Sequence, residues 1–413
     1  MIKSHPYLPT GVEEIRREMM KEIGIDDISE LFEDIPSEVK LKRSLQIPGP
    51  YPELEVRRDI AKTLEKNTSS VDIPVFLGAG VWPHYVPAVV EEIVRRAEFL
   101  TSYTPYQSEA SQGMLQALFE YQSMICALTE MEFANCSLYD WASSLGEAAR
   151  MASRVTGRNE VIVPHYLHPE RLATLRAYSE PAGIEIIEVQ QDRETGQIIL
   201  KDLERKLSSR TASVYIENPS YLGYVETEVE AIGDATHKNG ALFIVGADPI
   251  SLGIMKPPGD YGADIVIGEG QPLGNRMNFG GPLLGILTCR GERLLRQMPG
   301  RIIGMTTTID GSQRAYCMVL QTREQHIRRE KATSNICSNE ALCAVAAAVY
   351  LALLGPEGLK SLCRTILTKS QYAIKRLSEI KGLRTPAFDA PHFKEFTVNF
   401  ERSGKTVEEI HRS

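Results

Sequence analysis

The hydrophobic and polar positions follow two alternating periods along most of the chain. Short continuous runs of β-branched and aliphatic residues predict strands. These runs cover residues 160–164, 184–189, 211–219, 241–248, 264–270 and 283–288. Segments with helical periodicity, such as 169–179 and 226–239, separate several of them. Continuous apolar strands that alternate with helices are typical of a parallel sheet covered by helices on both faces. The pattern therefore predicts a large α/β domain with a mostly parallel sheet, residues 68–320.

Before this domain, residues 1–67 are predicted to form an N-terminal helical arm. Four apolar residues recur at helical spacing and make one stripe, and Asp26 is placed to cap the start of that helix. The stripe consists of Ile28, Leu31, Phe32 and Ile35. Because little apolar surface lies nearby in sequence, we expect the stripe to dock on the main domain or on another subunit. The Pro- and Gly-rich segment 46–54 is predicted to be a linker.

After the large domain, residues 321–413 are predicted to form a small C-terminal α+β domain. A long helix runs from Ser338 to Leu354 and ends at a Gly-Pro pair, and a second helix follows from Glu357. The segments 382–388 and 395–400 have the composition of strands. The last residues begin a helix with nothing after it, so we expect this small domain to be truncated.

Composition and charge narrow the class of protein. The 413 residues are 43% hydrophobic and 24% charged, which is ordinary for a globular chain. The net charge of −8 and the absence of an extended basic stretch argue against a nucleic-acid partner. The longest apolar run, Cys343–Leu354, is too short to span a bilayer, and the N-terminus lacks the apolar core of a secretory signal. We therefore expect a cytoplasmic protein that does not enter a membrane.

The common cofactor and metal motifs are missing from the sequence. Seven cysteines occur without a CxxC pair, and there is no HExxH, so neither a metal site nor a disulfide framework is predicted. The segment 78–83 imitates a dinucleotide fingerprint but has Pro83 in place of the third glycine. Nucleotide-binding folds of the Rossmann and P-loop types are therefore not expected.

The parts of a pyridoxal phosphate site, in contrast, can be placed on the predicted elements. Asp248 ends a strand at the edge where ligands bind, and would hold the pyridine nitrogen protonated. A helix that starts near Ser143 and Ser144 would receive the phosphate at its N-terminus. His165 follows another strand, where an imidazole would stack on the ring. Taken singly, each has a structural interpretation: a turn, an N-cap and a structural histidine.

The fourth part, the lysine that forms the Schiff base, is absent from its expected position. The position lies after the strand that follows Asp248, and there the sequence GEGQPLG places Gln271. A carboxamide has no nucleophilic amine, so it cannot bind the cofactor covalently. The nearest lysine, Lys256, precedes this strand. The predicted site is therefore a vestigial one, complete in outline but without its reactive group.

Several long segments give the chain a specific resemblance. It resembles the P-protein (glycine decarboxylase) family of the glycine cleavage system, and in particular the first, alpha, chain of the two-chain form. The matching segments are HPYLP near the start, TSYTPYQSEASQG at 101–113, GEGQPLG at 268–274, MPGRIIG at 298–304 and LQTREQHIRREKATSNIC at 320–337. The resemblance covers essentially all residues, although members of the family continue beyond residue 413.

The resemblance implies a fold, a cofactor and partners. The fold is type I of the pyridoxal phosphate enzymes, and the cofactor is bound covalently by a beta subunit of the same fold in an α2β2 heterotetramer. With that subunit the chain decarboxylates glycine and passes the aminomethyl group to the lipoyl H-protein. The segment 101–113 lies at the subunit interface and faces the partner's active site. The candidate contributors to that site are Tyr103, Tyr106, Gln107 and Glu109.

Other interpretations remain open on the sequence. A basic group could bind the carboxylate of glycine or the acidic surface of the lipoyl carrier, but Glu324 and Glu330 are at hand, which favours a structural role. This group consists of Arg301, Arg323, Arg328, Arg329 and Lys331. The chain could also be a self-sufficient pyridoxal enzyme that uses Lys256 or Lys331. It could finally be a structural or regulatory paralogue of the beta subunit with no direct role in the active site.

Overall fold

The computed structural model describes residues 7–412, and the chain divides into two compact units, one ending at Ile73 and the other beginning at Pro74. The sequence places this boundary near residue 67. The second unit is not divided further, and a separate small domain from residue 321 stays a prediction.

The first unit is helical, as the sequence predicts, and the described side chains in it are all exposed or half-exposed. Its elements are η1 (Pro9–Gly11), α1 (Glu13–Ile23), η2 (Ile28–Phe32) and α2 (Glu53–Leu64). The cap of η2 is Asp27 and not Asp26: the Asp27 carboxylate accepts the Ser29 N–H at 2.8 Å, and Glu30 completes a capping box. The prediction of Asp26 was therefore wrong by one position.

The second unit is built on a seven-stranded sheet in the order β1-β7-β6-β5-β4-β2-β3. The five strands from β3 to β6 are parallel to their neighbours, whereas β7 runs antiparallel to β6 and β1 runs antiparallel to β7. The strands are β1 (Phe133–Ala134), β2 (Glu160–Pro164), β3 (Glu185–Val189), β4 (Thr211–Glu217), β5 (Leu242–Ala247), β6 (Ile265–Glu269) and β7 (Gly285–Cys289). The predicted mostly parallel α/β sheet is confirmed.

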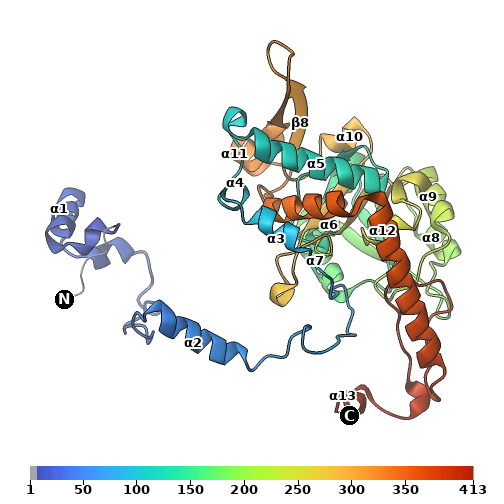
Figure 1. Ribbon diagram of the computed structural model, residues 1–413. Helices are drawn as coiled ribbons and strands as arrows, with labels where there is room; N and C mark the ends of the chain where they lie inside the picture. Colours follow the sequence, from blue (N-terminus) through green and yellow to red (C-terminus); the bar gives the residue numbers. More distant parts are fainter. Residues whose placement is uncertain (1–6, 413) are drawn as a thin grey trace. The chain divides into compact units, whose positions relative to one another are not determined.

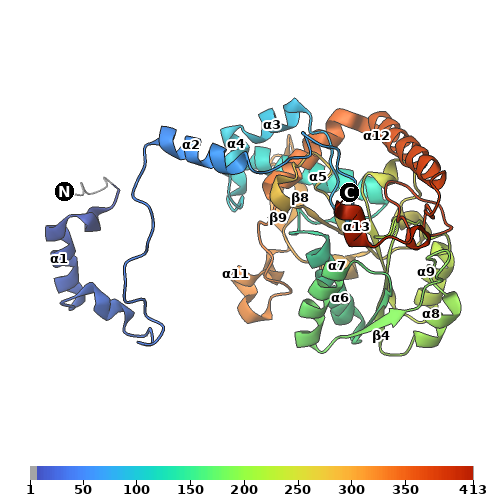
Figure 2. The same ribbon diagram turned by 90° about the horizontal axis from the view of Figure 1, so that it is seen from below.

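Alternate side chains of the strands pack on opposite faces of the sheet. On one face, residues such as Ile244 and Ile265 pack with α6 (Trp141–Thr156) and α7 (Pro169–Ser179), which lie side by side (Figure 2). On the other face, residues such as Phe243 pack with α8 (Leu200–Lys206) and α9 (Val229–Lys238). Both faces are therefore covered, which explains why the strands read as continuous apolar runs.

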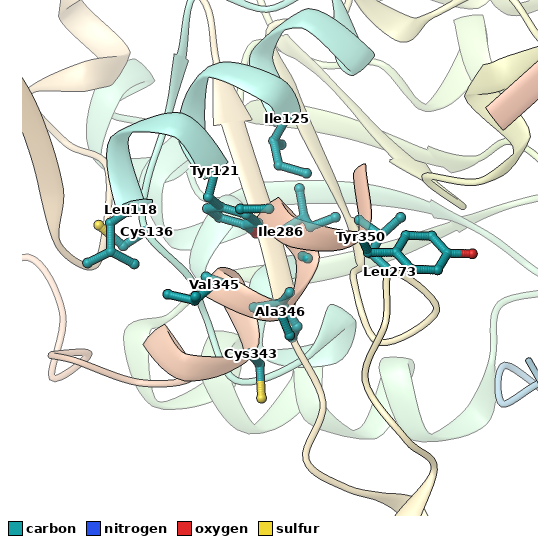
Figure 3. Close-up of a cluster of buried hydrophobic side chains, with 14 of the residues drawn as sticks. Leu118, Tyr121, Ile125, Cys136, Leu273, Ile286, Cys343, Val345, Ala346 and Tyr350 are labelled. Atoms are coloured by element: carbon teal, nitrogen blue, oxygen red, sulfur yellow. The ribbon is translucent and has the colours of Figure 1, made fainter. Parts of the chain in front are cut away.

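A further apolar cluster joins the N- and C-terminal helices of this unit to the sheet (Figure 3). Tyr121 and Ile125 from α5 (Gln112–Thr129) pack against Val345 and Ala346 from α12 (Ala341–Ser378) and against Ile286 of β7. The remaining helices of the unit are α3 (Ala88–Val94), α4 (Ala97–Leu100), α10 (Glu292–Leu295), α11 (Gln325–Arg328) and α13 (Val407–Arg412). Short 3₁₀ helices are η3 (Ser108–Ala110), η4 (Glu180–Ala182), η5 (Ser251–Gly253), η6 (Pro258–Tyr261), η7 (Asn278–Gly280), η8 (Gln321–Arg323), η9 (Arg329–Lys331) and η10 (Glu401–Ser403).

Helix α12 bends sharply in its middle (Figure 1). The backbone leaves helical geometry at Gly355, with φ 58° and ψ −178°, next to Pro356. The predicted succession of two helices is thus confirmed, but the first begins at Ala341 and not at Ser338. Within residues 7–412, α12 is the one helix that is long and apolar enough to cross a membrane, but it spans the bend and packs against α3 and α5 as a core helix does.

Two further features differ from the sequence-based expectation. An antiparallel pair that was not predicted, β8 (Ile302–Thr307) and β9 (Arg314–Val319), forms a separate two-stranded sheet. The segments predicted as C-terminal strands, 382–388 and 395–400, form no strands: they are joined by an isolated bridge between Arg384 and Asn399 and by the Ala387 N–H, which donates to the Thr397 carbonyl oxygen at 2.8 Å. That strand prediction was wrong, because two segments without a third strand beside them have no sheet to complete among the described residues.

Candidate functional site

The carboxyl ends of the parallel strands carry the candidate site. Strand β4 ends at Glu217, β5 is followed by Asp248, and β6 ends at Glu269, two residues before Gln271. Helix α6 begins at the same edge, because the backbone N–H of Trp141 donates to the Glu269 carboxylate at 3.3 Å. These acidic and amide side chains are all buried.

Three of the four predicted cofactor-binding residues are buried, and the fourth, His165, is not. Asp248, directly after strand β5, and the two serines of helix α6, Ser143 and Ser144, are buried at this edge. His165 follows β2, but its imidazole is half-exposed and its Nδ1 lies 2.8 Å from the Glu188 carboxylate. The histidine therefore pairs with Glu188 on β3, and it is not among the residues that line the pocket beside Asp248.

The N-terminus of α6 is already capped by carboxylates. The helix starts at Trp141 and not near Ser143, since Asp140 is its N-cap and accepts the Ser143 N–H at 2.6 Å. Both serine hydroxyls donate back to the Asp140 carbonyl oxygen, at 3.1 and 2.7 Å. The N–H groups of Trp141 and Ser143 and both serine hydroxyls are thus engaged within the chain, and two carboxylates at this end would repel a phosphate dianion.

The Glu269 carboxylate is the second of these groups. It accepts the backbone N–H groups of Gln271 at 2.9 Å and Leu284 at 2.7 Å, in addition to that of Trp141. Burial raises the pKa of Glu269 to about 7, although the three N–H donors oppose the shift. The side chain therefore ties the start of α6 to the loop that follows β6 and titrates near neutrality.

This titration predicts a pH-dependent stability. The folded chain holds a proton on Glu269 between its ordinary pKa of 4.5 and about 7, whereas the unfolded chain has lost it. Stability should therefore fall as pH rises through this window, by roughly 3 kcal/mol at most. In Glu269→Gln, the difference in unfolding free energy between pH 5 and pH 8 should shrink by about that amount in urea titrations. The exposed-site control Glu204→Gln should keep the wild-type difference, and an unchanged slope in Glu269→Gln would refute the assignment.

Asp248 itself is engaged by a lysine from the C-terminal part of the unit. The ammonium of Lys394 lies 2.6 Å from the Asp248 carboxylate and 3.4 Å from the centre of the Trp82 ring. Both charged side chains are largely buried. The acid that would hold a pyridine nitrogen is therefore already paired with a cation of this chain.

A second buried pair fills the floor of the same pocket. The guanidinium of Arg171 donates to Glu217 at 2.7 Å and lies 3.7 Å from the ring centre of Trp141. The indole N–H of Trp141 donates to the Tyr215 hydroxyl at 2.9 Å, and that hydroxyl donates to Glu217 at 3.0 Å. The Arg171 Nη1, the Trp141 indole N–H and the Tyr215 hydroxyl are thus all engaged within this network.

The remaining space is too small for a cofactor. A cavity of about 20 Å³ is all that is left between Asp248, Lys394, Trp141 and Arg171. A cavity of this size holds about one water molecule, which needs roughly 10–15 Å³. The residues present therefore do not fit pyridoxal phosphate. The acid that would hold its pyridine nitrogen, the helix start that would hold its phosphate and the place of its ring are each occupied by side chains of this chain.

The candidate lysines do not restore the site. Gln271 is buried after β6 and its amide donates to the Arg276 carbonyl oxygen at 3.4 Å. Lys256 is exposed and pairs with Glu230 at 2.7 Å, and Lys331 is exposed on η9. Neither lysine lines the pocket beside Asp248.

A second cluster of side chains forms around Arg301, which does not line the pocket beside Asp248. The guanidinium of Arg301 forms a buried ion pair with Glu324, and donates to the Tyr106 hydroxyl at 3.0 Å and to the Cys337 sulfur at 2.9 Å. Burial, together with the neighbouring Arg301, lowers the pKa of Arg323 to about 10. This engagement of Arg301 supports the structural interpretation of the basic group.

The predicted interface residues lie on the surface around this cluster. Tyr103 is 75% exposed and borders a cavity of about 200 Å³ that Arg301 also lines. Tyr106, Gln107 and Glu109 are exposed as well. Their phenol, amide and carboxylate groups are thus presented to solvent in this chain, as contributors to a partner's site would have to be.

Sequence reasoning missed the groups that close the pocket. Lys394, Arg171 and the two tryptophans were not singled out, and Glu269 stood unremarked beside Gln271. A signal existed for the tryptophans, because the chain has only two, Trp82 and Trp141, and both line the pocket. No local pattern marks Lys394, because its partner Asp248 lies far away along the chain.

Comparison with known proteins identifies close relatives. A family model described as "Glycine cleavage system P-protein" matches residues 5–412. The chain is 48% identical to the probable glycine dehydrogenase (decarboxylating) subunit 1 of Staphylothermus marinus, covering 99% of this chain and 88% of the relative. It is 51% identical to the protein of the same name from Aeropyrum pernix, over 95% and 86%.

Solved structures agree with these relatives. A crystal structure of glycine decarboxylase (P-protein) of the glycine cleavage system, in inhibitor-bound form, superposes with a TM-score of 0.86 at 40% identity, covering 100% of this chain and 90% of that chain. Mouse CSAD shares the fold alone, with a TM-score of 0.65 at 16% identity over 94% and 81% of the two chains.

Proposed function

The chain belongs to the glycine cleavage system P-protein family, and on this premise we propose that it works as subunit 1 of a two-subunit glycine dehydrogenase (decarboxylating). The observation that carries the proposal is the match along the whole chain to relatives named as subunit 1, at 48–51% identity. That name implies a second subunit. In this proposal the two subunits together decarboxylate glycine and transfer the aminomethyl group to the lipoyl H-protein.

The partner subunit holds the cofactor in this proposal. The family depends on pyridoxal phosphate, which acts as an electron sink for carbanion chemistry when it is bound. The buried amide at Gln271 and the filled pocket beside Asp248 support placing the cofactor in the other chain. We infer an α2β2 heterotetramer in the cytoplasm, in which this chain lends surface to the partner's site.

The part of this chain that contributes to the partner's site is the segment around Tyr103. Exposed phenol, amide and carboxylate groups there, on Tyr103, Tyr106, Gln107 and Glu109, could orient a substrate carboxylate or a phosphate of the partner's site. The buried Arg301 holds Tyr106 from behind through its hydrogen bond of 3.0 Å. The role of this chain is thus to position groups and to exclude water.

The decisive test is an exchange assay between labelled bicarbonate and glycine in the presence of lipoyl H-protein. The two subunits are produced together and separately, and each preparation is assayed. We expect exchange with the pair and none with either chain alone. Exchange by this chain alone would overturn the proposal and favour a self-sufficient enzyme.

The runner-up function is a structural or regulatory paralogue, and Tyr103 separates it from the main proposal. In Tyr103→Phe, loss of a hydrogen bond to a charged group should lower turnover of the assembled pair about tenfold to a hundredfold. The control is Tyr372→Phe, a similarly exposed tyrosine on α12. Wild-type turnover in Tyr103→Phe, with assembly unchanged in size-exclusion chromatography, would favour the paralogue.

A further inference from the structure

The pocket beside Asp248 is closed by a short C-terminal segment, Pro391–Thr397, which we name the strap. One side of the strap follows the loop after β4, because the Val225 N–H donates to the Pro391 carbonyl oxygen at 2.8 Å. The Thr397 hydroxyl donates to the Leu222 carbonyl oxygen at 3.1 Å on the same side. The strap is therefore held by hydrogen bonds at both of its ends.

The other side of the strap is held by α12. The Ser370 hydroxyl donates to the Phe393 carbonyl oxygen at 2.5 Å, and the Gln371 amide donates to the His392 carbonyl oxygen at 3.2 Å. Ser370 and Phe393 are buried. These contacts hold the next residue, Lys394, in a fixed position between α12 and the loop after β4.

From this position Lys394 reaches into the pocket. Its ammonium meets the Asp248 carboxylate at 2.6 Å, and the Trp82 ring lies 3.4 Å away on a cation–π contact. A buried carboxylate needs one cationic partner, and here that partner is supplied by the chain. The aromatic ring that could stack on a cofactor covers the ammonium instead.

We propose that Lys394 is an internal lock, which takes the place of a pyridinium at Asp248 and keeps the pocket of this subunit closed. The inference rests on the proposed function, in which the partner holds the cofactor. It adds that the ammonium on Asp248 excludes the cofactor independently of the missing amine at position 271. Restoring only the amine should not reopen the site.

A tethered ammonium has an advantage over a cofactor in solution. Because the strap holds Lys394 within contact distance, its effective concentration at Asp248 is at least of millimolar order. A pyridine ring would have to displace it and also leave the ammonium buried without its carboxylate. Free pyridoxal phosphate at micromolar concentration therefore loses this competition.

The test uses the two-subunit complex and trapping by borohydride. Gln271→Lys alone, and the same change combined with Lys394→Met, are incubated with pyridoxal phosphate, reduced, digested and mapped by mass spectrometry. We expect the peptide that contains position 271 to carry at least about tenfold more label in the double variant than in Gln271→Lys. The partner's own labelled peptide in the same digest calibrates the reaction.

Two controls keep the test specific. Gln271→Lys combined with Lys256→Met removes an exposed lysine instead, and should label as weakly as Gln271→Lys alone. Equal labelling of Gln271→Lys and the Lys394→Met double variant would overturn the lock. An unlabelled position 271 in both would overturn it as well, because other groups would then close the pocket. Failure of the wild-type exchange assay would instead contradict the proposed function, so the two failures are distinguishable.

A measurement on the unaltered complex avoids any folding defect. Acetylation of lysines by an N-hydroxysuccinimide ester is followed site by site by mass spectrometry. Lys394 should react at least about tenfold more slowly than the exposed Lys256. In Asp248→Asn, which removes the charge that holds the ammonium, Lys394 should react faster. Rapid acetylation of Lys394 in the wild-type complex would refute the lock.

Discussion

Replacing Arg301 by methionine is expected to destabilise the chain by about 3–5 kcal/mol, because it leaves the Glu324 carboxylate buried without its cation. Both side chains are about 4% exposed, so water cannot take the place of the guanidinium. The hydrogen bonds to Tyr106 and Cys337 are lost at the same time. Relief of repulsion with the neighbouring Arg323 offsets part of the loss. The measurement is the midpoint of urea unfolding.

Two variants separate the ion pair from general damage. Combining Arg301→Met with Glu324→Gln removes both charges, and should recover a large part of the lost stability. Arg296→Met breaks the exposed pair with Glu292, which is worth no more than about 1 kcal/mol. An Arg301→Met protein as stable as Arg296→Met would show that the buried pair does not stabilise the fold.

Gly223→Ala is expected to destabilise the chain by about 2–5 kcal/mol, the sum of backbone strain and a clash with the strap. Gly223 has a φ of 95°, which an L-residue rarely adopts. A Cβ atom here would lie 2.2 Å from the Glu395 carbonyl oxygen, which belongs to the strap backbone and cannot rotate away. The variant should therefore push the strap outward and speed acetylation of Lys394.

The matched control is Gly157→Ala, at the C-terminus of α6. Gly157 also has a positive φ, 71°, but a Cβ atom there would meet nothing within 4 Å. Only the strain of roughly 1–2 kcal/mol remains. Chemical unfolding of both variants gives the difference, and equal losses would mean that the strap yields without resistance.

The core of the fold was predictable because its signal is local. Strands such as β2 and β4 are buried on both faces, so each reads as an apolar run, and their predicted bounds agree with the structure to within about two residues. The hairpin of β8 and β9 gave no such signal, because its outer half, including Met305 and Arg314, is exposed. The helix start at Trp141 was missed because Asp140 and the serines after it are all good N-caps.

The sequence predicted where the site lies, but not whether its pocket is open or closed. The places of Asp248 and Gln271 follow from counting strands, since side chains after parallel strands meet at one edge. Whether the pocket behind them is open depends on Lys394, whose contact with Asp248 no local pattern encodes. His165 stands after the correct strand, but the neighbouring Glu188 on β3 holds its ring.

By itself, the sequence determined the parallel α/β architecture, the membership of the P-protein family and the absence of an amine at position 271. These follow from hydrophobic period, long matching segments and the chemistry of one side chain. Only the tertiary structure decided that Asp248 is neutralised by Lys394 and that the start of α6 is closed by Asp140 and Glu269. Such contacts join elements that are distant along the chain, and their energy depends on burial, which exists only after the chain has folded.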